Sequence, residues 1–275
     1  MAEKTNGAVP PDRPIAALQG LVSVIVPCCG MLEYTKLCVP SLLRHTRPPF
    51  EMIFIDIGSL DGTAEYLAGV AAASRAPVTV IRALTDLDIP RVCDEAISAA
   101  SGEYVVVLNN DTIVTDSWLN QLIGLSSLTP AIGMVGPMSN YAAPPQLVET
   151  VPYRIGPKKG GRALGVPEFL VDVSAVSAFA AEFREKHKGQ WLEVERLGGF
   201  CLLIKRQVLY KILSALEKWT DLTLFDTDIL SAKARQAGFT LACCRDLYIH
   251  HFGTRQFAHG APAERLTTQA TDGHG

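Results

Sequence analysis

The hydrophobic residues of this chain occur in two patterns. Short, wholly apolar runs rich in valine and isoleucine are typical of strands buried on both faces of a parallel sheet. Between them, apolar residues three or four positions apart predict amphipathic helices. The predicted strands cover residues 22–27, 52–56, 78–81, 104–108, 132–135, 200–205, 239–243 and 247–249, and the predicted helices cover residues 32–45, 91–100, 118–125, 169–188 and 226–236, with a further helix around Tyr66, Leu67 and Val70.

Strands and helices that alternate over short connections predict βαβ units, and therefore a mostly parallel sheet with helices on both faces. The second half of the chain departs from this alternation. Residues 140–167 are rich in proline and glycine and are predicted to be loop. Lys158, Lys159 and Arg162 form a small basic patch there, but the segment lacks the residue order of a P-loop, so we interpret it as a flexible loop.

Length and composition narrow the class of protein. The chain has 275 residues, 48% of them hydrophobic, and can bury the core of one large or two fused domains. Its net charge of −3 argues against nucleic acid and anionic membranes as partners. No apolar run approaches the ~20 residues of a membrane helix, so we expect no transmembrane segment. Residues 1–20 lack the apolar core of a signal peptide and are predicted to be a flexible leader.

The seven cysteines are an odd number, and none of them is in C-x-x-C spacing. Cys28-Cys29 and Cys243-Cys244 lie in apolar, strand-like runs, where cysteine is expected to pack as a small hydrophobic residue. Together with the leader, this predicts a reduced protein located in the cytoplasm, or peripherally at the inner face of a membrane.

Polar residues directly follow two of the predicted strands. The sequence Asn-Asn-Asp-Thr at 109–112 ends the apolar run 104–108, and Asp56 ends the run 52–56. Ligands of open α/β sheets bind outside the carboxyl ends of the strands, so Asp56 and Asp111 are expected at the same edge. A carboxylate flanked by amides there is a hard-oxygen ligand for Mg²⁺ or Mn²⁺ carrying a diphosphate. The alternative is a plain turn, which these residue types also favour.

The end of the first strand excludes one nucleotide-binding class. It reads Pro27-Cys-Cys-Gly30 and not G-x-G-x-x-G, which argues against an NAD-dependent Rossmann enzyme. The chain also lacks, after this strand, the glycine-rich basic loop with which a sugar nucleotidyltransferase would hold a triphosphate. A nucleotidyltransferase is therefore only a distant alternative.

Eight short motifs resemble glycosyltransferase family 2, and the resemblance runs from about residue 22 to residue 257. No single motif is specific, but their order and spacing together are. The matching segments are Val24-Ile-Val-Pro27, Leu32-Glu-Tyr-Thr35, Asp56 with Gly58-Ser-Leu-Asp-Gly-Thr63, Gly102-Glu-Tyr104, Asn109-Asn-Asp-Thr112, Gly136-Pro137 with Ser139-Asn-Tyr141, Gly199-Phe-Cys-Leu-Leu-Ile204, and His250-His-Phe-Gly253.

This resemblance implies an α/β fold of the GT-A type, in which a Rossmann-like, mostly parallel sheet is flanked by helices and followed by a mixed acceptor part. It implies one domain over residues 21–257, with a nucleotide-binding half at about 21–137, an acceptor half at about 138–257, and a flexible tail at 258–275. The implied activity is transfer of a sugar from a nucleotide-sugar donor, usually with inversion, to a glycan, a protein or a lipid-linked sugar.

The same resemblance assigns roles to residues. Asp111 would hold Mn²⁺ or Mg²⁺ together with His250 or His251, although adjacent histidines can also simply end a surface strand. Ser59 or Asp61 can alternatively cap the helix that follows them. Asp56 would hold the nucleoside, and Arg255 could pair with phosphate. The residues expected at the nucleotide-sugar are Pro27, Asp56, Ser59, Asp61, Arg91, Asp94, Asn109, Asn110 and Arg255.

Several positions depart from the family pattern. Asn109 replaces the first carboxylate of the D-x-D-type motif, so Asp111 is the only charged residue in it. Extra carboxylates near a diphosphate would repel it unless they are paired or solvated. The other departures are Ile57 in place of Asn, and Asp86, Asp88 and Asp94 in place of Asn, Gly and Asn, with Arg91 close enough in sequence to offset one of the three.

The catalytic base is the least regular position. An inverting transfer needs a carboxylate that accepts the proton of the acceptor hydroxyl. Relatives supply it from Glu-Asp-x-Asp at the start of a helix, and an ungapped alignment places Thr227 on the base position. Because threonine is no base at neutral pH, we predict Asp228, ahead of Asp226, in this role; N-terminal capping of the helix is the alternative for both.

A glycosyltransferase-like module that binds nucleotide or a partner, with little or no transfer, stays open as a second hypothesis.

Overall fold

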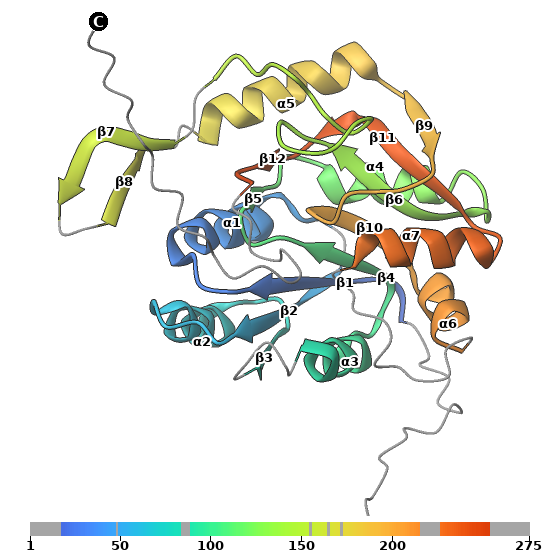
Figure 1. Cartoon of the computed structure of the whole chain (residues 1–275), viewed down its shortest axis with the longest axis horizontal. Coiled ribbons are helices and arrows are strands. Elements are labelled where there is room, and N and C mark those ends of the chain that lie inside the picture. The colour runs from blue at the N-terminus through green and yellow to red at the C-terminus, as the bar shows by residue number, and fades with distance from the viewer. Residues whose placement is uncertain are drawn as a thin grey trace, which may run out of the picture.

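The computed structural model describes residues 18–47, 49–83, 89–153, 156–163, 166–170, 173–214 and 226–253. Its central element is an eight-stranded sheet in the order β3-β2-β1-β4-β10-β6-β11-β9 (Figure 1). Strands β1 to β4 are parallel to one another, whereas β10 is antiparallel to both of its neighbours. The strands of this sheet are β1 Leu18–Cys28, β2 Phe50–Ile57, β3 Val78–Ala83, β4 Gly102–Leu108, β6 Ile132–Met138, β9 Trp191–Val194, β10 Cys201–Lys205 and β11 Thr240–Tyr248.

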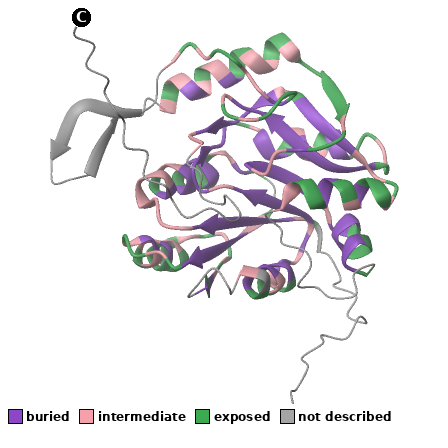
Figure 2. Cartoon of the chain, viewed as in Figure 1, coloured by how far each residue is buried: buried purple, intermediate pink, exposed green. Residues whose placement is uncertain are grey.

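Helices cover both faces of the sheet, because its central strands carry apolar side chains on both sides (Figure 2). In β1, Val24 and Val26 point into one core and Ile25 into the other. The first core is closed by α1, α2 and α4, and the second by α3, α6 and α7. The helices are α1 Leu32–His45, α2 Thr63–Ala73, α3 Ile89–Ala99, α4 Trp118–Ser126, α5 Val173–His187, α6 Arg206–Ser214 and α7 Thr227–Gln236.

Two short sheets lie outside the central one. The first pairs β5 Thr112–Ile113 with β12 His250–His251, with His251 opposite Thr112. This pairing brings the end of the described chain to the loop that follows β4. The second is a hairpin of β7 Gly156–Ala163 and β8 Val166–Leu170.

The predicted elements agree with the structure over most of the first half, and α1 has the predicted bounds. In the second half, the prediction of loop over residues 140–167 is confirmed for residues 140–153 and wrong beyond them, because β7 and the start of β8 lie there. Residues 239–243 and 247–249 belong to one strand, β11, or to its end. Strands β5, β9 and β12 and helix α6 were not predicted, and residues 18–20 of β1 were expected to belong to the leader. Residues 1–17 and 258–275 lie outside the described chain.

In the part of the chain that the structure describes, no helix combines the length and the apolar composition needed to cross a bilayer.

Candidate functional site

The predicted strand-end aspartates lie on one edge of the central sheet, as parallel strands require. Asp56 is the Cα partner of Cys28 at the end of β1, and Asp111 follows β4, which pairs with β1 on its other side. Both side chains are buried. The backbone of Asp111 is held by Phe252, whose N–H donates to its carbonyl oxygen over 3.0 Å. The C-terminal end of the described chain therefore forms part of this edge.

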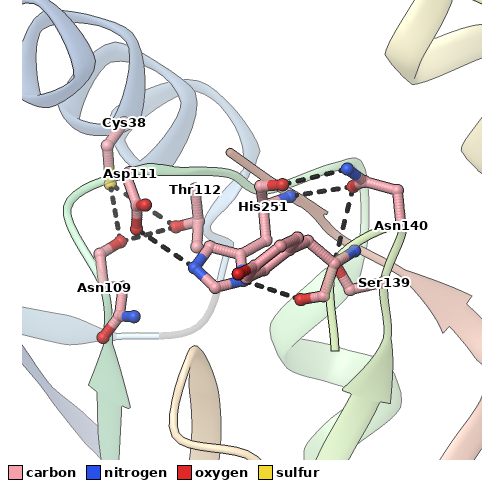
Figure 3. Close-up of polar contacts among 8 residues, drawn as sticks. Cys38, Asn109, Asp111, Thr112, Ser139, Asn140 and His251 are labelled. Carbon is pink, nitrogen blue, oxygen red and sulfur yellow. Dashed lines mark hydrogen bonds and ion pairs between the residues drawn. The ribbon is translucent and has the colours of Figure 1, made fainter. Parts of the chain in front are cut away.

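His251 faces the carboxylate of Asp111 directly (Figure 3). Its Nε2 lies 3.3 Å from Asp111 Oδ1. Its Nδ1 lies 2.8 Å from the carbonyl oxygen of Tyr141. A carbonyl can only accept a hydrogen bond, so Nδ1 carries the proton. When the imidazole is neutral, its Nε2 lone pair points at the carboxylate oxygen, an arrangement that a cation bound to both atoms would stabilise. When Nε2 is also protonated, the two side chains form an ion pair.

Aromatic rings fix the plane of this imidazole. Phe200, directly before β10, stacks on His251 with ring centroids 5.2 Å apart and an interplanar angle of 16°. Tyr141 meets the ring in an edge arrangement at 5.4 Å. His251 is thus held by its ring and by Nδ1, while Nε2 stays directed toward Asp111.

His250 lies on the other side of β12, because successive side chains of a strand alternate. Its Nδ1 contacts the hydroxyl of Tyr153 over 3.0 Å, and its ring packs edge-on against Phe252. Burial, with the neighbouring His251 adding to it, lowers the pKa of His250 to about 4, so this imidazole is neutral. Of the two predicted histidines, the structure brings His251 to Asp111 and places His250 in an aromatic cluster.

The two amides before Asp111 differ in surroundings. Asn109 lines a pocket described below. Asn110 is buried, and its Nδ2 donates to the carbonyl of Gly30 and to Thr35 Oγ1, at 3.2 and 2.8 Å. Its Oδ1 has no hydrogen-bond partner among the described residues. The amide nitrogen of Asn110 therefore joins the loop before α1 to the first turn of that helix.

Asp56 is fixed by two donors. Its Oδ2 accepts from Arg82 Nε over 3.1 Å and its Oδ1 from the backbone N–H of Ser59 over 3.3 Å. Arg82 was not among the predicted site residues; the parallel pairing of β2 and β3 places it beside Asp56. Pro27, one position before the end of β1, is buried next to this site.

Ser59 and Asp61 join two loops at the sheet edge. Ser59 Oγ accepts from the N–H of Gly30 over 2.8 Å, and Asp61 Oδ2 accepts from the N–H of Leu32 over 2.9 Å. Burial alone would raise the pKa of Asp61, but hydrogen bonds from Thr63 and Leu32 lower it below its usual value. The N-cap position of α2 is Gly62, but Asp61 Oδ1 accepts from the N–H of Thr63, the first residue of α2, over 3.2 Å. Asp61 therefore satisfies a donor at the start of this helix, as the capping alternative predicted.

Of the charged residues expected near the diphosphate, the structure describes Arg91 and Asp94, both on α3. Arg91 pairs with Glu95 on the same helix at 3.0 Å, and its Nη2 donates to the carbonyl of Arg82 over 3.3 Å. Burial raises the pKa of Asp94. Asp86, Asp88 and Arg255 lie outside the described residues.

A pocket of about 630 Å³ opens beside the Asp111–His251 pair. Asn109 and His251 line it, and Tyr141 and Phe200 add aromatic surface. Its remaining lining residues are Val107, Asn140, Ala142, Ala143, Leu147, Gly198, Gly199 and Thr227. The pocket therefore combines one potential metal ligand with mostly apolar walls.

The start of α7 reaches this pocket through Thr227. A Cβ on Gly199 would lie 2.8 Å from Thr227 Cγ2, so glycine is needed for this contact. Asp226 is instead the N-cap of α7 and accepts from the N–H of Ile229 over 3.1 Å. The carboxylate of Asp228 is 74% exposed and 4.0 Å from Arg196. Neither predicted base is among the residues that line the pocket, because one carboxylate caps the helix and the other faces solvent.

Protein ligands alone do not complete a metal site here. Across the described ranges, no group of three or more His, Cys, Asp and Glu side chains could hold an ion. A cation at Asp111 and His251 would therefore take further ligands from a bound phosphate or from water.

The chain is similar to known proteins over much of its length. The model of the family described as "Glycosyl transferase family 2" matches residues 23–160. An uncharacterized protein, y4gI, of Sinorhizobium fredii is 28% identical over 241 residues, 86% of this chain and 25% of that protein. Glycosyltransferase GlyG of Streptococcus pneumoniae is 27% identical over 44% of this chain and 40% of its own length. The chain thus matches a quarter to two fifths of these relatives.

Solved structures share the fold. The mannosyltransferase PcManGT of Pyrobaculum calidifontis, in complex with GDP-Man and Mn²⁺, has a TM-score of 0.58 at 16% identity, covering 92% of this chain and 62% of its own. GalNAc-T7, with UDP, GalNAc and Mn²⁺, has a TM-score of 0.60 at 18% identity, covering 90% and 46%. These similarities confirm the GT-A fold that the sequence predicted.

Proposed function

Because the chain belongs to glycosyl transferase family 2, we propose that it transfers a sugar from a nucleotide-sugar donor to an acceptor hydroxyl. We further propose that the transfer depends on Mn²⁺ or Mg²⁺ and inverts the anomeric carbon. Structures that share the fold contain GDP-Man or UDP together with Mn²⁺, which makes these nucleotides the first donors to test.

The Asp111–His251 pair carries this proposal. A buried carboxylate oxygen and an imidazole nitrogen whose lone pair is directed at it form the donor set of a divalent cation. The protein supplies these two ligands, and the donor diphosphate is expected to supply others. A bound cation would neutralise the charge that develops on the leaving nucleoside diphosphate.

On the donor side, Asp56 is proposed to accept a hydrogen bond from the nucleobase. Its carboxylate is held rigidly by Arg82 and Ser59, and it lies at the sheet edge where GT-A and other α/β folds bind nucleotides. Ser59 and Asp61 would act indirectly, by fixing the loops at Gly30 and Leu32 that border the nucleotide.

On the acceptor side, Thr227 favours a second candidate function. The residue at the base position lines the pocket but cannot take a proton, and the carboxylates of Asp226 and Asp228 are engaged elsewhere. This arrangement supports a glycosyltransferase-like module that binds a nucleotide-sugar and transfers it slowly or not at all. We rank it second, because His251 Nε2 lies 3.3 Å from Asp111 Oδ1 and Asp56 is held at the sheet edge by Arg82, a geometry that supports binding of a cation and a nucleotide.

One experiment separates the two functions. The protein is incubated with Mn²⁺ and a panel of UDP- and GDP-sugars, with glycan, protein and lipid-linked acceptors, and both donor binding and release of the nucleoside diphosphate are measured. Metal-dependent binding with turnover supports the transferase, and tight binding without turnover supports the module. Failure to bind any donor would refute both.

A further inference from the structure

The side chain of Asn140 forms hydrogen bonds with both the carbonyl oxygen and the N–H of His251. Its Nδ2 donates to the carbonyl oxygen of His251 over 2.9 Å, and its Oδ1 accepts from the N–H of His251 over 3.0 Å (Figure 3). The next residue, Tyr141, accepts the proton of His251 Nδ1. The segment of residues 140–141 therefore fixes the backbone of His251 and the rotation of its ring.

Asn140 is itself anchored. The hydroxyl of Tyr248 donates to its Oδ1 over 2.9 Å. Just before it, Ser139 pairs with the far end of the loop: its N–H donates to the carbonyl of Gln146 over 2.8 Å and its carbonyl accepts from Val148. Gln146 in turn donates to the carbonyl of Pro137. These contacts hold Asn140 by bonds that do not involve His251.

His251 needs such a partner because its own strand is short. Strand β12 has two residues and pairs with the two residues of β5. The imidazole must nevertheless keep Nε2 at 3.3 Å from Asp111. A backbone shift of a few tenths of an ångström is enough to spoil a ligand position, so the residues that orient a metal ligand matter nearly as much as the ligand.

We propose that Asn140 is the positioning residue that holds His251 Nε2 in place for a divalent cation shared with Asp111. The inference rests on the proposed function, because it assigns Asn140 to the same metal site. Asn140 also lines the pocket, so its side chain joins the metal ligand to the surface that would face the substrates. No contact of Asn140 with the cation itself is required.

Mn²⁺ binding tests this role without measuring turnover. Free Mn²⁺ is followed by electron paramagnetic resonance while the protein is titrated, with UDP or GDP present and without either nucleotide. Asn140→Ala is expected to weaken Mn²⁺ binding about 10–100-fold, the range for loss of a residue that orients a metal ligand. Asn140→Leu keeps the branched shape of the side chain without its hydrogen bonds, and gives the same measurement if the alanine variant does not fold.

Two controls distinguish positioning from a general contribution to folding. Asn120→Ala makes the same change at an exposed position of α4, and Ile212→Ala removes buried apolar volume from α6. Both residues lie on helices and outside the lining of the pocket. Each is expected to bind Mn²⁺ within twofold of the unmodified protein, even where its thermal midpoint falls.

Three results would overturn the inference. A folded Asn140 variant that binds Mn²⁺ as tightly as the unmodified protein would refute the role of Asn140 alone. Failure of both Asn140 variants to fold would assign the residue to stability instead. An unmodified protein that binds no Mn²⁺ under any condition would refute the metal site itself, and with it this part of the proposed function.

Discussion

Arg82 and Asp56 lie directly opposite each other in the register of β3 and β2, and the guanidinium donates Nε–H to the carboxylate over 3.1 Å. The carboxylate side chain is 1% exposed and the arginine 60%. The pair therefore joins a buried charge to a solvated one at the position proposed for the nucleoside.

Removal of Arg82 should leave the buried carboxylate without its cation. Arg82→Ala is expected to lower the free energy of unfolding by roughly 1–3 kcal/mol, less than for a fully buried pair because the arginine is largely solvated. Urea unfolding measures this change. Arg82→Lys keeps the charge and should recover part of the loss; equal stability of all three proteins would contradict the importance of the pair.

Asp111 should be essential for the cation. In Asp111→Asn the volume is kept but the anionic ligand is lost, so Mn²⁺-dependent donor binding should disappear while the thermal midpoint changes little or rises. His251→Ala should weaken the same binding without abolishing it. Titration calorimetry with and without Mn²⁺ measures both, and Mn²⁺-dependent binding that survives Asp111→Asn would show that the cation lies elsewhere.

His250 should make the stability of the metal-free protein depend on pH. The folded state has a pKa of about 4 for this residue, against 6.5 for the ordinary value, so the unfolded chain binds the proton more readily between these pH values. The contribution is fully present above pH 6.5 and is lost as pH falls toward 4, by about 3 kcal/mol in all.

Unfolding in urea at a series of pH values measures the slope that His250 contributes. In His250→Gln this slope should vanish, because the side chain no longer titrates. An unchanged slope in the variant would assign the pH dependence to other groups.

Thr227 should limit the rate of transfer. Thr227→Asp places a carboxylate of similar size in the pocket, and a positioned general base typically contributes 10²–10⁴-fold. We therefore expect transfer to rise by about 10²-fold, with donor affinity unchanged, in an assay of nucleoside diphosphate release.

Asp228→Ala is the matched control for Thr227→Asp, since it changes a carboxylate on the same helix that is exposed. It should leave turnover and donor binding as they are. Loss of turnover with intact binding in Asp228→Ala would instead support the base that the sequence predicted.

The sequence predicted those parts of the fold that repeat a local pattern. The helix at Leu32–His45 and the buried strands around Val24 and Val106 could be predicted because burial on two faces leaves a continuous apolar run. Helix α6 could have been predicted from Val208, Leu209 and Ile212, which have helical spacing. It follows β10 without a break, so its apolar residues resemble a continuation of the strand.

The site could be predicted only in part. Asp56 and Asp111 follow strands, so their shared edge is a consequence of parallel topology. The choice of His251 over His250 depends on which face of a two-residue strand meets β5, and the roles of Asn140 and Arg82 depend on pairings between distant segments. No local pattern in the sequence determines such contacts.

The pairing of β12 with β5 also determines when the cation site can exist. Asp111 and His251 come from the middle and the far end of the described chain, so a nascent polypeptide has the parallel strands β1 to β4 long before it has the second ligand. A cation at this proposed site would therefore bind only after β12 has paired with β5. By mass action, such binding would stabilise the docked β12 segment.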